Sequence, residues 1–149
     1  MNNIHLRYNN ARILLVDDEP LVLDMFDAVL RAEGFEVVTA LSSDEACNLL
    51  SKESFDVLLC DIWLDTMDGF AVARFARERL SSIGVALVTG RPSEKDEELA
   101  ESLGYQYLSK PVPFDILRES VFKAIESNSE FCKKVIAEGA VSKTSNISS

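Results

Sequence analysis

Five short apolar runs alternate with longer amphipathic segments, and this alternation constrains the fold more than any other feature of the sequence. The runs are RILLV at 12–16, FEVVTA at 35–40, FDVLLCDI at 55–62, GVALVTG at 84–90 and YQYLS at 105–109. Each run has the length of a β-strand. Strands that alternate with helices pair in parallel through right-handed crossovers. The sequence therefore predicts a five-stranded α/β sandwich.

The segments between the runs carry helix signals. Gly34 is expected to end the first helix, a Ser42-x-x-Glu45 capping box to begin the second, and Pro113 to lie in the first turn of the last. The fourth helix is strongly acidic. The apolar faces predicted for the first, third and fourth helices are Leu21, Val22, Met25, Phe26, Val29 and Leu30; Phe70, Ala73, Ala76 and Leu80; and Leu99, Ala100 and Leu103.

Charge and cysteine content exclude several function classes. Twenty-five acidic against 15 basic residues give a net charge of -10, which argues against direct binding to nucleic acid or to an anionic membrane. No apolar stretch reaches the ~20 residues of a membrane span, and the first residues lack the apolar centre of a signal peptide. Three widely spaced cysteines without a CxxC pair fit reduced thiols. We expect a cytoplasmic protein whose partners are proteins.

The chain of 149 residues is long enough for one domain with a full core. We expect a flexible leader at 1–10, a folded domain at 11–127 and an extension at 128–149. The extension begins with a Ser127-x-x-Glu130 capping box, followed by Phe131, Cys132, Val135 and Ile136 at helical spacing and by Gly139 as a stop. This pattern predicts a short sixth helix or a continuation of the fifth. Whether it packs on the domain, pairs with another chain or begins a linker stays open, and residues 140–149 are expected to be disordered.

Reactive side chains follow four of the five predicted strands. Asp17 and Asp18 end the first strand, Asp61 the third and Thr89 the fourth, and Lys110 follows the fifth. Ligands of open parallel sheets bind beyond the carboxyl ends of the strands, so these residues are expected to converge there. Clustered carboxylates suit Mg²⁺, and a carboxylate that attacks phosphorus forms an aspartyl phosphate. The lysine and the hydroxyl would then bind phosphoryl oxygens.

Four motifs, in this order and spacing, make the chain resemble a two-component response-regulator receiver domain: LLVDDEP, LLCDIWLDTMDGF, LVTGRP and YLSKP. The resemblance covers residues 11–127. It implies a flavodoxin-like, doubly wound parallel sheet with strand order 2-1-3-4-5. Asp65 departs from the pattern, because the family usually has proline there.

The resemblance also implies residue roles. Asp61 would be the phosphoacceptor and a Mg²⁺ ligand, together with Asp18 directly, Asp17 mainly through water, and the backbone carbonyl of Trp63. Thr89 and Lys110 would contact the phosphoryl group, and the Lys110–Pro111 bond would be cis. Thr89 and Tyr107 would form the switch that changes the surface made by the fourth helix, the fifth strand and the fifth helix.

The function implied is a switch phosphorylated by a histidine kinase or phosphotransfer protein. It would catalyse its own phosphorylation and dephosphorylation without turning over an external substrate, and would signal to a protein effector or to an output domain outside this sequence. A homodimer is left open. One alternative is a pseudo-receiver that binds proteins without using phosphorylation. Another is a haloacid-dehalogenase-like phosphohydrolase, which would need a second acid where Trp63 stands. We further hypothesise that Trp63 and Arg91 crowd the phosphoryl group and slow its hydrolysis.

Overall fold

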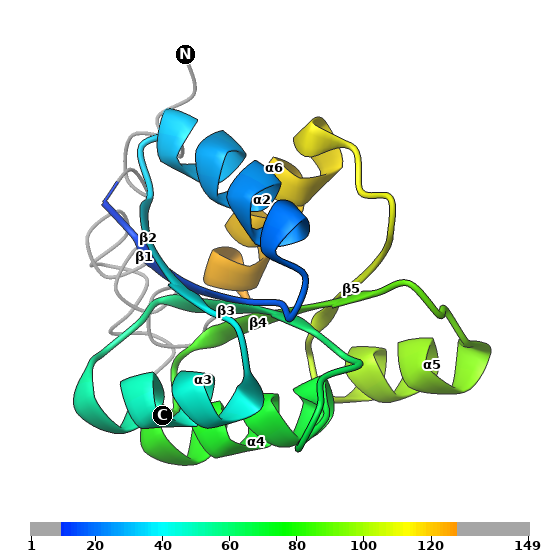
Figure 1. The fold of residues 1–149 in the computed structure, drawn as a ribbon. Coiled ribbons are helices and arrows are strands. Elements are labelled where there is room, and N and C mark those ends of the chain that lie inside the picture. Colours follow the sequence, from blue (N-terminus) through cyan, green and yellow to red (C-terminus); the bar gives the residue numbers. More distant parts are fainter. Residues whose placement is uncertain (1–9, 128–149) are drawn as a thin grey trace, which may run out of the picture.

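The computed structural model describes residues 10–127, in which five parallel strands form one sheet in the order β2-β1-β3-β4-β5 (Figure 1). The predicted fold class and strand order are therefore confirmed. The strands are β1 (Arg12–Val16), β2 (Glu36–Ala40), β3 (Val57–Asp61), β4 (Gly84–Thr89) and β5 (Gln106–Ser109).

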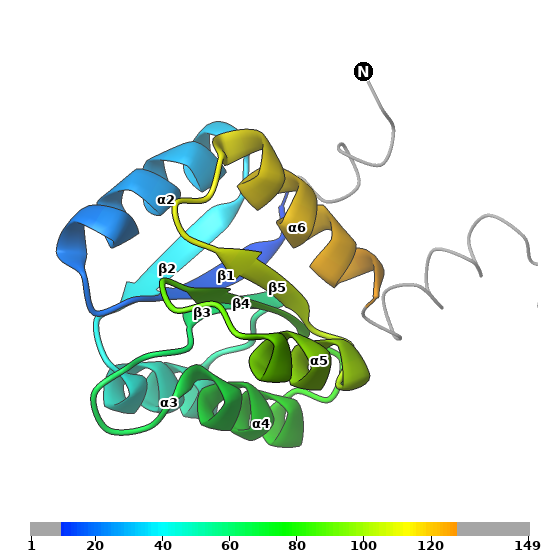
Figure 2. The ribbon, with the colours of Figure 1, turned by 90° about the vertical axis from the view of Figure 1, so that its right-hand side faces the viewer.

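The described helices cover both faces of the sheet. Helices α2 and α6 lie on one face, and α3, α4 and α5 lie on the other, as both ribbon views show (Figures 1 and 2). The helices are α2 (Pro20–Ala32), α3 (Ser43–Lys52), α4 (Gly69–Arg79), α5 (Glu94–Ser102) and α6 (Phe114–Glu126).

Two apolar clusters hold the layers together, one on each face of the sheet. Along β1, Ile13 and Leu15 belong to the cluster with α2 and α6, whereas Leu14 and Val16 belong to the cluster with α3 and α4. Every residue of β3 and of β4 is buried, as expected for central parallel strands covered on both faces. The sheet is therefore a rigid base for whatever lies at its ends.

The helix ends follow the sequence signals closely. Pro20 begins α2, and Gly34, just beyond its end, has a φ of 98°, a conformation that favours glycine. The hydroxyl of Ser42 accepts a hydrogen bond from the Glu45 amide, while the Glu45 carboxylate accepts one from the Leu41 amide. Pro113 differs slightly from expectation, because it caps α6 instead of lying in its first turn.

Gly69 lets the first turn of α4 approach the end of β3. A Cβ atom there would lie 2.5 Å from the backbone oxygen of Asp61, closer than real side chains come. The Gly69 amide donates to the Ile62 carbonyl at 2.7 Å. This close contact fixes the course of the loop that follows Asp61.

Several apolar residues predicted to face the core are exposed instead. Leu21 is 78% exposed and Met25 52%, and the buried residues of α2 include Leu23 in their place. In α5, Leu99 is 43% exposed and Leu103 45%, and Ala100 is the buried residue. The reason is that α5 packs beside β5, an edge strand, and approaches the sheet through this small side chain.

The expectations for the leader at 1–10 and the extension at 128–149 fall outside the described residues, except at residue 10. In the described part of the chain, no helix combines the length and hydropathy that crossing a membrane requires.

Candidate functional site

The parallel register brings the predicted site residues to one edge of the sheet. Val16 pairs with Cys60, so that Asp17, which follows β1, lies beside Asp61 at the end of β3. Asp61 in turn pairs with Val88, the neighbour of Thr89, and Thr89 pairs with Ser109, the neighbour of Lys110. The carboxyl ends of four strands therefore bring three acids, a hydroxyl and an ammonium group together, as predicted.

Four carboxylates form a tight cluster at this edge. Asp17, Asp18, Glu19 and Asp61 each offer one oxygen atom, and these atoms all lie within 4.8 Å of one another. Asp17 and Asp61 are buried, whereas Asp18 and Glu19 are exposed. The cluster therefore has two carboxylates anchored in the domain and two that face solvent.

Lys110 provides the positive charge that this cluster requires. Its Nζ atom lies 2.9 Å from Oδ2 of Asp17 and 3.1 Å from Oδ2 of Asp61, and its side chain is only 16% exposed. It also lies 3.1 Å from Oε1 of Glu19. One ammonium group thus bridges carboxylates from two buried strands, which would otherwise repel each other. The Lys110–Pro111 peptide bond is cis, as the resemblance implied.

Burial and charge shift the pKa values in opposite ways. Burial raises the pKa of Asp61 above its ordinary value, although the hydrogen bond from Lys110 partly offsets this effect. Burial alone would lower the pKa of Lys110, but the hydrogen bonds and charges of Asp17 and Asp61 outweigh burial and raise it. Lys110 therefore stays protonated.

Backbone amides fix the orientation of the two buried carboxylates. The Trp63 amide donates to Oδ1 of Asp61 at 3.1 Å, and the Glu19 amide donates to Oδ1 of Asp17 at 2.9 Å. Each aspartate thus has one oxygen on a backbone amide and the other on Lys110. The side chains are held in place before any ligand arrives.

A pocket of about 280 Å³ opens over Asp61 and Lys110 and is bordered by Trp63 and Arg91. The Arg91 guanidinium carbon lies 4.8 Å from the centroid of the Trp63 ring, so that the two side chains stack at the mouth of the pocket. The Arg91 amide donates to the buried hydroxyl of Thr89 at 2.9 Å. Thr89 is therefore linked to the loop that carries Arg91.

Tyr107 lies apart from the carboxylate cluster. Its hydroxyl accepts a hydrogen bond from the Ser93 amide at 3.0 Å and donates to the Ser93 carbonyl at 3.4 Å. Ser93 is the N-cap of α5. In this structure the predicted switch residue therefore joins β5 to the start of α5.

Glu19 is the site residue to which the sequence assigned no role. Asp17 and Asp18 were selected as candidates because they end the first predicted strand, whereas Glu19, the next residue, was given no ligand or catalytic role. In the structure it belongs to the cluster and pairs with Lys110. Three consecutive acids at the end of one strand were the available signal.

Comparisons with known proteins identify the family of the chain. The family described as response regulator receiver domain matches residues 13–122. The chain is 32% identical over 124 residues to the transcriptional regulatory protein GlrR of Escherichia coli K12. This match covers 83% of the chain but only 28% of that relative.

Solved structures show the same similarity. A CheY-like response regulator receiver domain protein from Methanospirillum hungatei is 31% identical, with a TM-score of 0.73, over 81% of this chain and 98% of that one. A response regulator receiver domain protein from Clostridium thermocellum is 29% identical, with a TM-score of 0.74, over 85% and 98%. The chain therefore belongs to the response-regulator receiver family and contains the receiver domain of a two-component signalling protein.

Proposed function

We propose that this chain is a phosphorylation-dependent switch that accepts a phosphoryl group on Asp61. The observation that carries the proposal is the position of Asp61, which lies at the floor of an open pocket, 3.1 Å from Lys110 and within the carboxylate cluster. A lone surface carboxylate would need neither the buried ammonium group nor the neighbouring acids.

The donor set fits Mg²⁺, a hard cation that prefers carboxylate and carbonyl oxygens. Asp17, Asp18 and Asp61 would hold the ion together with the backbone carbonyl of Trp63, and the position of Glu19 in the same cluster adds a fourth carboxylate nearby. When bound, Mg²⁺ would neutralise the acids and allow an anionic phosphodonor to approach.

The chain's own residues account for the transfer step. An oxygen of Asp61 forms a bond to phosphorus while the bond from phosphorus to the donor's histidine nitrogen breaks, and the imidazole leaves with that electron pair. Lys110 and the Thr89 hydroxyl would bind the phosphoryl oxygens as negative charge develops on them. In the present structure the Thr89 hydroxyl accepts a hydrogen bond from the Arg91 amide, so its own proton is still available for a phosphoryl oxygen.

The signal would pass through Thr89 and Tyr107 to the surface formed by α5, β5 and α6. Support comes from the bonds of Tyr107 to Ser93, because a movement of this ring would release the start of α5. Phosphorylation would favour the second packing only as far as it binds that packing better.

The proposed partners follow from the family. A cytoplasmic histidine kinase or phosphotransfer protein would supply the phosphoryl group, and a protein effector or an output domain would read the switch. The functional unit would be residues 11–127. Because the chain spans 28% of GlrR, whatever that whole protein does is not carried over to this chain.

The test is intact mass after incubation with Mg²⁺ and acetyl phosphate. We expect a gain of one phosphoryl group, about 80 Da, that requires Mg²⁺ and is abolished by Asp61→Asn. Asp65→Asn, which changes an exposed acid in the same loop, is the control and should retain the gain. An unmodified wild type with a confirmed fold would contradict the proposal and favour the pseudo-receiver alternative.

A further inference from the structure

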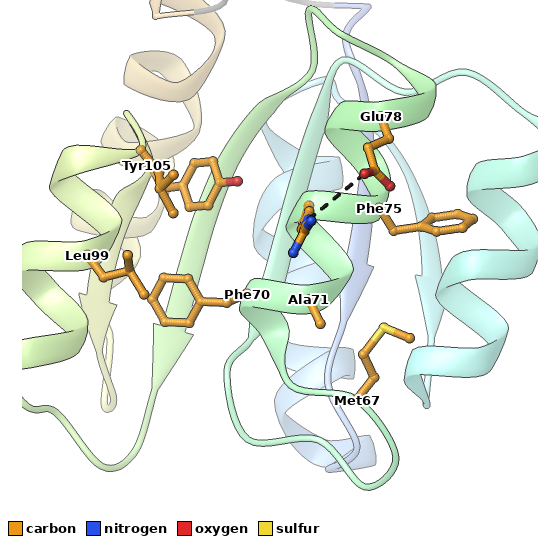
Figure 3. Close-up of a pocket in the computed structure, with 9 residues that line it drawn as sticks. Met67, Phe70, Ala71, Phe75, Glu78, Leu99 and Tyr105 are labelled. Atoms are coloured by element: carbon orange, nitrogen blue, oxygen red, sulfur yellow. Dashed lines mark ion pairs between the residues drawn. The ribbon is translucent and has the colours of Figure 1, made fainter.

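A groove with a volume of about 710 Å³ lies between α4 and α5, and no carboxylate of the cluster described above is among its lining residues. Its lining includes Phe70, Arg74 and Glu78 from α4, Leu99 from α5, Leu103 at the C-cap of α5, and Tyr105. Figure 3 shows Phe70 and Leu99 facing each other, with Tyr105 above them. Leu99 and Leu103 are the residues that were predicted to be core and are nearly half exposed. Within residues 10–127, this part of their apolar surface is left exposed.

We propose that the groove is the docking site of this chain's own segment 131–136, FCKKVI. The segment carries Phe131, Cys132, Val135 and Ile136 at a spacing that places them on one face of a helix. This apolar face matches the apolar lining of the groove. Docking of the segment would cover both the groove and the face of the segment.

Charge complementarity supports this occupant. Helix α5, which forms one wall, has five acidic residues and one basic residue in its sequence EKDEELAES. On the α4 wall, Glu78 pairs with Arg74 at 3.9 Å, so the acidic side of the groove is the one formed by α5 (Figure 3). The segment carries Lys133 and Lys134 beside its apolar residues, so that its positive charges would meet an acidic rim.

The path of the chain also supports it. The last turn of α6 lies against the start of β4, where a Cβ atom on Gly84 would collide with the Ala124 carbonyl oxygen. The groove lies near the same end of β4. Arg77 of α4 donates a hydrogen bond to the carbonyl of Ile83, the residue before Gly84, and its guanidinium group lies over the ring of Tyr105, which lines the groove. Figure 2 shows the C-terminal ends of α5 and α6 on one side of the molecule.

A short connection joins the segment to Ser127, the C-cap of α6. Phe131 follows Ser127 by four residues, and an extended stretch of that length reaches roughly 13 Å. Because the segment is tethered, its effective concentration at the groove would be of the order of millimolar, and a weak contact would be occupied.

Cys132 offers a direct readout, because docking would shield its thiol. Cys60 is buried, and Cys47→Ser removes the remaining partly exposed thiol, so that modification by a soluble maleimide reports on Cys132. In this full-length background we expect Leu103→Lys or Leu99→Lys to accelerate modification at least about fivefold. The matched control is Ile116→Lys, since Ile116 is also 45% exposed but lies on α6, outside the groove.

The measurement is made at several protein concentrations, with circular dichroism confirming each fold. An unchanged rate in both groove variants would overturn the proposal, and so would an equal acceleration by Ile116→Lys. Protection that grows with protein concentration would assign the groove to a second copy and would overturn docking within one chain. The measurement is made on unphosphorylated protein without a phosphodonor, so its outcome does not depend on whether Asp61 accepts a phosphoryl group.

Discussion

The carboxyl edge of the sheet contains buried charges, and the α4–α5 groove contains exposed apolar side chains. Folding alone favours neither feature. Only the buried charges are offset by a partner group among the described residues. At the edge, Asp17 and Asp61 are buried charges, and Lys110 lies within 3.1 Å of each. In the groove, Leu99 and Leu103 are apolar side chains that the described residues cover only in part. The buried charges at the edge are therefore paired within residues 10–127, whereas part of the groove's apolar surface stays exposed.

This difference teaches how to interpret the two regions. Compensated charge at an open pocket indicates chemistry, because the groups are held in place while remaining accessible to a small ligand. Uncompensated apolar surface indicates a contact with something larger that buries it. The two regions call for different experiments.

The largest expected effect is a difference in the free energy of unfolding between a variant of the carboxyl edge and a variant of the groove. Lys110→Met would leave two buried carboxylates without a positive partner and should lower the free energy of unfolding by about 2–4 kcal/mol in EDTA. Leu103→Lys should lower it by at most about 1 kcal/mol, because a partly exposed side chain contributes little. Urea denaturation measures both values. Equal losses of unfolding free energy in the two variants would contradict the comparison, because Lys110 would then contribute no more to stability than Leu103 does.

A smaller effect is expected on the stabilisation that Mg²⁺ gives to the folded protein. Mg²⁺ at ten times its dissociation constant should stabilise the wild type by about 1.4 kcal/mol, because it binds the folded carboxylate cluster. Asp18→Asn should abolish most of this gain, whereas Asp24→Asn, an exposed acid on α2 outside the cluster, should preserve it. Thermal unfolding with Mg²⁺ and with EDTA gives the two values. A gain that survives Asp18→Asn would contradict the proposed ligand set.

The smallest effect concerns the lifetime of the phosphorylated form. Trp63→Ala and Arg91→Ala should each shorten its half-life about two- to fivefold, because either change removes the stacked pair at the mouth of the pocket. Loss of the phosphorylated mass over time measures this rate, and Leu103→Lys should leave it unchanged. If the half-life were unchanged in both Trp63→Ala and Arg91→Ala, the hypothesis that these residues slow hydrolysis would be refuted.

Much of the fold and site could be predicted because local signals agreed with global ones. The apolar runs located all five strands to within two residues at either end, and RILLV matches β1 in full. Asp17, Asp61, Thr89 and Lys110 could be placed together because parallel strands bring their carboxyl ends to one edge.

The remaining features depend on tertiary packing. Helical spacing indicates which residues share a face, but not how much of that face the sheet covers, so the exposure of Leu21, Met25, Leu99 and Leu103 was missed. The pairing of Glu19 with Lys110 joins residues 91 positions apart, and sequence spacing does not reveal it.

The most direct test of the central claim is to locate the modified residue. Borohydride reduces an acyl phosphate to an alcohol and releases the phosphate, so that a phosphorylated aspartate becomes homoserine. The wild type would be treated with Mg²⁺ and acetyl phosphate, reduced, digested and mapped by mass spectrometry. The proposal predicts homoserine at position 61 only, and none when Mg²⁺ is omitted. Homoserine at Asp17, Asp18 or another acid, with none at Asp61, would contradict it.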